Sequence, residues 1–589
     1  MANNALGAIY DALTHEAREL YDSIFEPVIV GTPPSYAVRD LCVTQGGEIR
    51  HYGWRELSGR RARVFAASRD IGLNWELRFA SAGDIGACVQ SPWSGDWITL
   101  FTSQAEESKG VLCVARSATG SGDPSPETAT LPWTRLELRQ LIPLRYRQRW
   151  VATVTVGSPD CRFHAAVLLS DDDGRTWRKI DIAPVPDVAR LSPGDLRPRW
   201  FSNGCEPAVA ELSDGSLLLA LRTSGPLAAF CRSEDGGVTW SVPKPRDGFW
   251  QCTTMPGFLR LSDGRLLFFW NNTAHLPTRD VSEYPELTAG ERDGVWEAVF
   301  TNRDVLHAAI SDDDGRTWRG FREIALNESR NATDFRELGN GAFDEADKSV
   351  HQTQALELPG GKVLVAYGQN PAARHLAIFD PGWLLETSRS EDFRHGLGNV
   401  SHHLYVRSLS GGYRGWAGHC AWNRVPGAVM SREPDAPEGR WTRESMLLAH
   451  IRDPRLVSDV AGAVWNFPAA RAGRVSVECR IEGAGFRLSL LDHWINPCDV
   501  FNAKRAPFTE TIDVGIAGKG WRKVDVEWNC ETATAKLLVD GRAICEVALG
   551  GVPPFGFSYL HLQAADGQPD PDGTYFRSFS AQASHTWAH

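Results

Sequence analysis

The eight residues Ser311-Asp-Asp-Asp-Gly-Arg-Thr-Trp318 follow the pattern Ser-x-Asp-x-Gly-x-x-Trp, which this chain contains four times. The other three copies begin at Ser68, Ser170 and Ser233. A motif that recurs at intervals of tens of residues is typical of a fold built from several copies of one supersecondary unit. Within each copy, Asp and Gly favour a tight reversal of the chain, and the Trp supplies a large apolar anchor for the turn.

Up to about residue 385, apolar runs of strand length alternate with turn sequences. The ranges 208–222, 258–269 and 355–365 each predict a hairpin, in the first case around Ser213-Asp-Gly215. The interval between the first two motifs is wide enough for two units, with a degenerate turn in the range 116–133. We therefore expect six units, each roughly 60 residues long.

The motif resembles the Asp box of the sialidase superfamily. That resemblance implies an all-β chain whose repeated part is a six-bladed β-propeller, with the Asp boxes in structural turns away from the active site. The remainder of the chain lacks the motif and carries alternating strands at 475–480, 486–490 and 524–528. This part resembles a concanavalin-like (jelly-roll) β-sandwich, whose role is either to bind carbohydrate or to cover one side of the propeller.

The expected domains are a helical segment at 1–30, the propeller at 31–385 and the β-sandwich at 386–589. Apolar residues at near-helical spacing predict one amphipathic helix over roughly residues 3–24 of the first segment. A chain of 589 residues is too long for a single core, which agrees with more than one domain. Its hydrophobic content of 42% excludes a mostly disordered chain.

Charge and cysteine content narrow the range of partners. A net charge of −11 argues against nucleic acid or an anionic membrane as the main partner. The chain has neither a long apolar run nor a signal-peptide pattern, so we expect a cytoplasmic protein. Its 12 cysteines form no Cys-x-x-Cys pair, which favours buried free thiols, and we expect no metal or other cofactor. Nothing in the sequence favours a particular oligomeric state.

Bacterial sialidases bind the substrate carboxylate with three arginines, pair a Glu with a Tyr nucleophile and use an Asp as acid/base. In this chain the resemblance assigns the Glu to Glu206, and the second and third arginines to Arg222 and Arg303. Arg39 is the best candidate for the first arginine, and Asp84 stands where the family often places an aspartate of the pocket. Guanidinium groups suit this role because they are permanently charged and bind a carboxylate through two nitrogens.

Two positions depart from the family pattern. Glu56 stands where the acid/base Asp is expected, 12 residues before the first Asp box. Where the Tyr nucleophile is expected, the chain carries His351 and Gln352 instead. We therefore take Glu56, Glu206 and His351 as candidate catalytic residues. Gln352 joins the three arginines and Asp84 as a candidate substrate contact, as does Trp54, which neighbours Glu56 and is suited to stacking on a sugar ring.

Three functions remain open, and all three involve an acidic oligosaccharide or glycan. The first is a glycoside hydrolase acting on a terminal acidic sugar, with Glu56 and Glu206 as its carboxylate pair. The second is a lyase acting on a uronate-containing glycan, in which arginines neutralise the carboxylate and His351 removes the adjacent proton. The third is a carbohydrate-binding propeller without catalytic activity.

Overall fold

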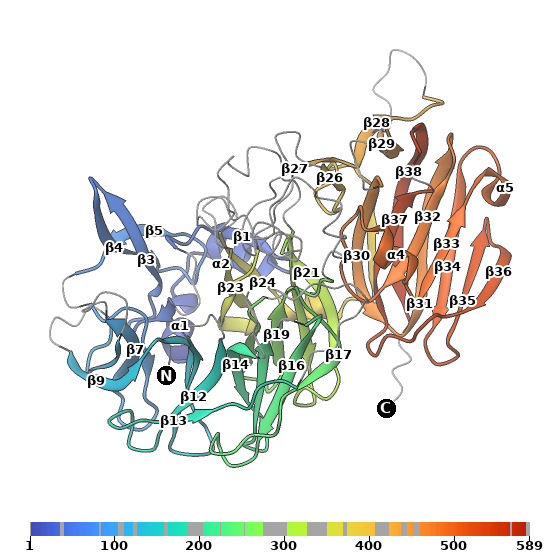
Figure 1. The fold of residues 1–589 in the computed structure, drawn as a ribbon. Coiled ribbons are helices and arrows are strands. Elements are labelled where there is room, and N and C mark those ends of the chain that lie inside the picture. Colours follow the sequence, from blue (N-terminus) through green and yellow to red (C-terminus); the bar gives the residue numbers. More distant parts are fainter. Residues whose placement is uncertain are drawn as a thin grey trace.

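A computed structural model gives the fold of the chain, which consists of two neighbouring all-β parts (Figure 1). The predicted all-β fold class, a propeller followed by a sandwich, is confirmed. The structure describes residues 2–584 except 36–39, 82–83, 104–110, 122–125, 158–162, 187–203, 224, 253, 275–302, 327–349, 369–373, 407–422, 437–443, 452–459 and 566–567.

The first part contains six antiparallel sheets of four strands, the blades of the propeller. In every blade the strands lie in chain order from the axis outward, apart from the outermost strand of blade 6. Blade 1 comprises β2 (Leu41–Val43), β3 (Ile49–Leu57), β4 (Arg60–Ser68) and β5 (Glu76–Phe79); blade 2 comprises β6 (Val89–Gln90), β7 (Trp97–Ser103), β8 (Val111–Ser117) and β9 (Glu127–Thr134); blade 3 comprises β10 (Leu136–Pro143), β11 (Trp150–Val156), β12 (His164–Ser170) and β13 (Arg178–Asp181). Blade 4 comprises β14 (Cys205–Glu211), β15 (Leu217–Arg222), β16 (Leu227–Ser233) and β17 (Lys244–Trp250); blade 5 comprises β18 (Gly257–Arg260), β19 (Leu266–Trp270), β20 (Val305–Ser311) and β21 (Arg319–Leu326); blade 6 comprises β22 (Gln354–Glu357), β23 (Val363–Tyr367), β24 (His375–Phe379) and β1 (Val28–Gly31).

The ring of blades closes through contacts between segments that are far apart in the chain. Strand β1, from near the N-terminus, pairs with β24 as the fourth strand of blade 6. At the axis, the side-chain amide of Gln354 in β22 accepts a hydrogen bond from the backbone N–H of Leu41 at 2.8 Å and donates one to its carbonyl at 3.0 Å. This amide therefore joins the inner strands of blades 1 and 6 as a backbone pair would.

The Asp boxes connect the third and fourth strands of blades 1, 3, 4 and 5. In every copy the Ser hydroxyl accepts a hydrogen bond from the motif Gly N–H at 2.7–2.8 Å and donates one to the motif Asp at 2.8–2.9 Å. The Trp ring N–H donates to the Gly carbonyl at 2.8–3.0 Å. These bonds form within eight residues, which explains why the motif alone identifies the turn.

The N-terminal segment forms two helices, α1 (Ala2–Asp11) and α2 (His15–Ser23), so the prediction of one continuous helix was wrong. The chain is extended at Thr14, whose hydroxyl accepts a hydrogen bond from the backbone N–H of Ala17 and caps the second helix. The expected boundary between residues 30 and 31 falls inside β1, which belongs to blade 6.

The second part contains two packed sheets and a short strand pair. The larger sheet comprises β25 (Ser388–Glu391), β28 (Ala428–Arg432), β29 (Glu444–His450), β31 (Ala472–Ile481), β34 (Arg522–Asn529), β35 (Thr534–Val539), β36 (Arg542–Ala548) and β38 (Asp570–Ala583). The smaller sheet comprises β30 (Gly462–Ala470), β32 (Phe486–Leu491), β33 (Phe508–Ile512) and β37 (Phe557–Ala564), and β26 (His403–Val406) pairs with β27 (Asn423–Pro426). Among the described residues, the second part also has the short helices α4 (Val500–Lys504) and α5 (Val514–Ala517), while η3 (Pro359–Gly361) lies between β22 and β23 of blade 6 and η4 (Pro381–Leu385) follows β24.

The sandwich packs against blades 4 and 5 through buried polar and aromatic contacts. Trp250, at the end of β17, stacks on His493 with ring centroids 3.9 Å apart and donates a hydrogen bond to Asp492 at 3.1 Å. Residue Thr273, after β19, pairs with Trp494 of the sandwich in a parallel β-bridge. The sandwich therefore covers the side of these blades. Among the described residues, no helix has the length and apolar character needed to cross a membrane.

Candidate functional site

The repeated topology of the blades separates two ends of the propeller. The Asp boxes lie where third strands end, which is also the end at which the innermost strands finish. Glu206 lies at the start of an inner strand, Arg222 at the end of a second strand, Arg303 before a third strand and His351 before an inner strand. All four therefore lie at the end of the propeller opposite to the Asp boxes.

Glu206 is the centre of a buried ion-pair cluster. Its carboxylate accepts a hydrogen bond from Arg222 Nη1 at Oε2, at 2.7 Å. The guanidinium of Arg139, from β10 of blade 3, lies 3.1 Å from the other carboxylate oxygen. The exposed fractions of the Glu206 and Arg139 side chains are 8% and 7%, so both charges are almost completely removed from solvent. Two guanidiniums from neighbouring blades thus hold both oxygens of one carboxylate.

This arrangement keeps Glu206 ionised. Burial by itself raises the pKa of a carboxyl group, but the positive charges of Arg222 and Arg139 and the hydrogen bond from Arg222 act in the opposite direction. Together with the nearby His351 they lower the pKa of Glu206 to about 2. The Glu206 charge in turn raises the pKa of Arg222, against the effect of burial. Glu206 therefore does not exchange protons near neutral pH.

His351 and Arg303 form the second half of the cluster. Arg303 Nη1 lies 3.4 Å from His351 Nε2, and both side chains are buried. A backbone hydrogen bond keeps the two residues next to each other, because the N–H of Val350 donates to the carbonyl of Arg303 at 2.8 Å. The side-chain amide of Asn271 donates to the carbonyl of Val350 at 3.1 Å. His351 therefore lies next to Arg303, and it is close enough to Glu206 to contribute to the lowered pKa of that carboxyl group.

Gln352 is also buried and adopts a left-handed backbone conformation, with φ of 63°. Such a conformation is uncommon for a residue other than glycine and is often found at functional sites. Its side-chain oxygen accepts no hydrogen bond from the described part of the chain. Glu206, Arg222, Arg303, His351 and Gln352 are therefore the sequence-predicted site residues that the structure places in or next to one cluster.

Asp84 belongs to a separate buried group between blades 1 and 2. Its carboxylate accepts hydrogen bonds from the Tyr52 hydroxyl at 3.2 Å and from the N–H of Gly86 at 2.8 Å. Arg50 lies 3.9 Å from the same carboxylate. No contact recorded among the described residues joins this group to Glu206.

Glu56 and Trp54 lie outside the cluster. Glu56 is exposed near the tip of the β3–β4 hairpin, which projects from blade 1 (Figure 1). Trp54 lies on the same strand and is 49% exposed. Arg39 is outside the described residues. The structure thus brings Glu206 together with Arg222 and places Glu56 elsewhere, so these two carboxylates do not form a pair within the described contacts.

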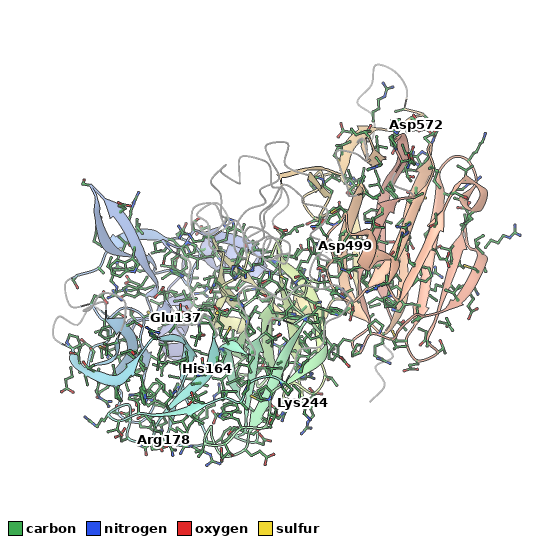
Figure 2. The ribbon with its side chains drawn as sticks, viewed as in Figure 1. Glu137, His164, Arg178, Lys244, Asp499 and Asp572 are labelled. Atoms are coloured by element: carbon green, nitrogen blue, oxygen red, sulfur yellow. The ribbon has the colours of Figure 1, made fainter. Side chains whose placement is uncertain are left out.

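Arg139 is the residue of the cluster that the sequence analysis missed. Its Nη2 also donates a hydrogen bond of 2.6 Å to Glu137, a largely exposed side chain labelled in Figure 2. A signal was present in Leu136-Glu-Leu-Arg-Gln-Leu141, where two consecutive polar residues interrupt the alternation of a strand. Such an interruption is expected at a β-bulge, which changes the face to which a side chain points.

A cavity of about 910 Å³ runs along the propeller axis, lined by inner-strand residues of all six blades. The lining is mainly apolar, and Arg139 and Thr353 contribute to it at the end nearest Glu206. The described residues contain no group of three or more His, Cys, Asp or Glu side chains arranged to hold a metal ion. Of the cluster residues, Arg139 belongs to the lining of this cavity, whereas Glu206, Arg222, Arg303 and His351 do not.

Residues 139–333, which are 195 of the 589 residues, match the family model of the BNR repeat-like domain. This segment holds three of the four Asp boxes and includes Glu206, Arg222 and Arg303. The repeat identified in the sequence is thereby confirmed over this segment. A comparison with curated proteins found no match to the chain.

Solved structures with similar folds include a protein of unknown function from Dyadobacter fermentans, with 18% identity, 60% of this chain and 97% of the other covered, and a TM-score of 0.37. Trypanosoma rangeli sialidase in complex with sialic acid has 13% identity and a TM-score of 0.35, and the match covers 93% of this chain and 91% of the sialidase. NanB sialidase from Streptococcus pneumoniae has 13% identity and a TM-score of 0.37, and the match covers 63% of this chain and 73% of the NanB chain. At these values the assignment of the fold rests on the sheet topology described above.

Proposed function

We propose that this protein is a glycoside hydrolase that acts on a terminal acidic sugar. The single observation that supports this proposal is the buried cluster in which Arg139 and Arg222 hold Glu206 while Arg303 contacts His351. Three guanidiniums from blades 3, 4 and 5 surround one carboxylate and one imidazole. Guanidinium groups are permanently charged and bind carboxylates through two nitrogens, so this cluster favours a ligand that brings a carboxylate of its own.

In the proposed reaction His351 activates the attacking water. It occupies the position at which the sialidase resemblance expects a nucleophile, and the neighbouring Glu206 charge stabilises the imidazolium that forms when it accepts a proton. Arg222 and Arg303 bind the substrate carboxylate, and Gln352, Asp84 and Trp54 are retained as proposed substrate contacts. Arg39 is retained as a proposed additional arginine. Glu56, on the exposed hairpin at the same end of blade 1, is the proposed donor of a proton to the leaving oxygen.

One observation favours a second candidate, a lyase on uronate-containing glycans. Arg303 contacts His351 directly, so a base and a carboxylate-neutralising group are already adjacent. In an elimination the imidazole removes the proton next to the carboxylate, the carbon–oxygen bond to the leaving sugar breaks, a carbon–carbon double bond forms, and the departing oxygen takes up a proton from water or from the imidazolium. This reaction needs no second carboxylate beside Glu206.

The test is incubation of the full-length protein with glycosides of sialic acids, glycosides of uronic acids, and neutral glycosides of matched linkage. Hydrolysis releases reducing sugar without a new ultraviolet absorbance, whereas elimination produces the absorbance of an unsaturated uronate. Release of reducing sugar only from acidic substrates is the expected result. Equal activity on neutral and acidic substrates, or binding without turnover, contradicts the proposal.

Arg303→Met with Arg322→Met as a control tests the role of the guanidinium cluster. Both arginines are buried in blade 5, but Arg322 lies on the outer strand, where it is bound to Glu386 and stacked on Trp383. We expect Arg303→Met to lower activity on acidic substrates by at least about 100-fold, as the loss of a buried charge-stabilising donor does. The Arg322→Met variant, assayed below its unfolding temperature, retains activity.

A further inference from the structure

Arg139 and Glu206 both lie at irregular positions of adjacent inner strands. In blade 3 the pairing of β10 with β11 skips Arg139, passing from Leu138 directly to Gln140. In blade 4 the pairing of β14 with β15 passes from Cys205 to Ala208, so that Glu206 lies inside the irregularity. Bulges of this kind change the direction of a side chain, and they are frequent next to active sites.

The hydroxyl group of Thr155 is hydrogen-bonded to residues of both bulges. Thr155, in β11, accepts a hydrogen bond from Arg139 Nε at 3.2 Å and another from the backbone N–H of Glu206 at 3.0 Å. The backbone of Glu206 has a φ of 45°, a left-handed conformation that costs free energy for a residue with a side chain. The contacts from Arg139 and Thr155 hold Glu206 in this conformation.

The two arginines that bind Glu206 are not equivalent. Arg222 stands next to Glu206 in the same blade, whereas Arg139 reaches it from blade 3 and lines the axial cavity. A buried carboxylate held on one oxygen only can rotate about its terminal bonds. Binding of the second oxygen from another blade removes this freedom and surrounds the charge with fixed positive groups.

We propose that Arg139 is a positioning residue of the site: it holds Glu206 in one orientation and in its charged form, so that Glu206 acts as a fixed charge and not as a proton carrier. This inference rests on the proposed function, because it assigns a role to Glu206 within that reaction. Glu206 then stabilises positive charge on His351 and on the reacting sugar, and proton transfer is left to other groups. The charged and titratable groups that act on Glu206 are Arg139, Arg222 and His351, and Arg139 itself also binds Glu137.

The first experiment measures the coupling between Arg139 and Glu206 without any substrate. Wild type, Arg139→Met, Glu206→Gln and the double variant are unfolded by heat between about pH 7 and about pH 3. Because the pKa of Glu206 is lowered in the folded protein, its stabilising contribution is present at neutral pH and is lost as the pH falls toward 2. We expect Arg139→Met to unfold at a lower temperature than wild type, with a deficit that narrows as the pH falls. In the Glu206→Gln background this narrowing disappears.

The second experiment measures turnover of the acidic substrate identified above. We expect Arg139→Met to lower kcat by roughly 100-fold, because small displacements of reacting groups have effects of this size, with a smaller change in KM. In the Arg139→Met variant the acid limb of the pH–activity profile moves to higher pH, because Glu206 takes up a proton more readily once Arg139 is removed. Arg139→Lys, which restores the charge but not the planar fork, recovers part of the loss.

Arg116→Met is the matched control. Arg116 is also an arginine that bridges two blades, with a side chain that is 10% exposed, but its partners are Asp96 and Asp173 at the Asp-box end of the propeller. If Arg139→Met leaves the pH–activity profile unchanged, as Arg116→Met does, or if its thermal deficit depends on pH in the same way in the Glu206→Gln background, Arg139 is merely structural and the inference is overturned. If no acidic substrate is turned over, the proposed function fails, and the thermal experiment still decides whether Arg139 controls Glu206.

Discussion

Tyr559 of the sandwich donates a hydrogen bond of 2.7 Å to the carboxyl group of Glu323 in β21 of the propeller. The ring of His307, in β20, contacts the same hydroxyl. Burial raises the pKa of Glu323 to about 7, although the nearby positive charges of Arg389 and Arg322 act in the opposite direction. The contact between the two domains therefore contains a carboxyl group that is protonated below neutral pH.

The stability of the wild type should consequently depend on pH at this position. A pKa that is raised on folding contributes stability that is complete below the unfolded value of about 4.5 and is lost as the pH rises through about 7. Glu323→Gln keeps the size of the side chain and removes the titration. Above about pH 7 this variant should be more stable than wild type by on the order of 2 kcal/mol, with the difference shrinking toward pH 4. Thermal unfolding across this range measures the difference, and a constant offset at every pH would contradict the assignment.

Asp313 supports the Asp-box turn of blade 5. Its carboxylate accepts hydrogen bonds from the hydroxyls of Ser311 and Thr317 and from the backbone N–H of Thr317. Burial tends to raise the pKa of Asp313, but the Thr317 and Ser311 hydrogen bonds lower it overall. Asp313→Ala should therefore destabilise the protein by about 2 kcal/mol at neutral pH, with a smaller effect as the carboxyl becomes protonated. Asp312→Ala, which removes the neighbouring exposed carboxylate, should have little effect, and chemical denaturation compares the two.

Gln354 joins the first and last blades through both of its amide atoms. Gln354→Met keeps the shape of the side chain but leaves the N–H and carbonyl of Leu41 without these partners. We expect a loss of about 2 kcal/mol in the free energy of unfolding. Gln140→Met is the comparison, because within the described part of the chain Gln140 makes one such bond, which it accepts from the N–H of Val209 at 2.9 Å. Equal losses for the two variants would mean that closure of the ring does not depend on Gln354.

The role of Glu56 is testable separately from the guanidinium cluster. As a proton donor to the leaving oxygen, it should matter most for substrates with poor leaving groups, so Glu56→Gln should lower their turnover by about 100-fold or more. An activated aryl leaving group, which needs no proton, should be released at a nearly unchanged rate. Glu76→Gln, another exposed glutamate of blade 1, serves as the control. If Glu56→Gln cleaves both substrate types like wild type, another group supplies the proton.

The arrangement of Glu206, Arg222 and Arg303 at one end of the propeller could be anticipated from the sequence. Their spacing from hairpin turns and Asp boxes sets the position of each residue along its strand, and the repeated topology then places these positions at the same end of the fold. The pairing of Glu206 with Arg139 could not be anticipated in this way. It depends on bulges in two different blades, and a bulge shifts a side chain to another face without leaving a clear mark on spacing.

The sequence by itself determined the blades and their turns, because the hydrogen bonds of an Asp box form among eight consecutive residues and need no partner from elsewhere. Only the tertiary structure decided which charges meet. Arg139 and Glu206 are far apart in the chain, Gln354 closes the ring on Leu41, and Tyr559 reaches Glu323 from another domain. These contacts depend on how complete sheets pack around an axis, and local sequence patterns do not contain that information.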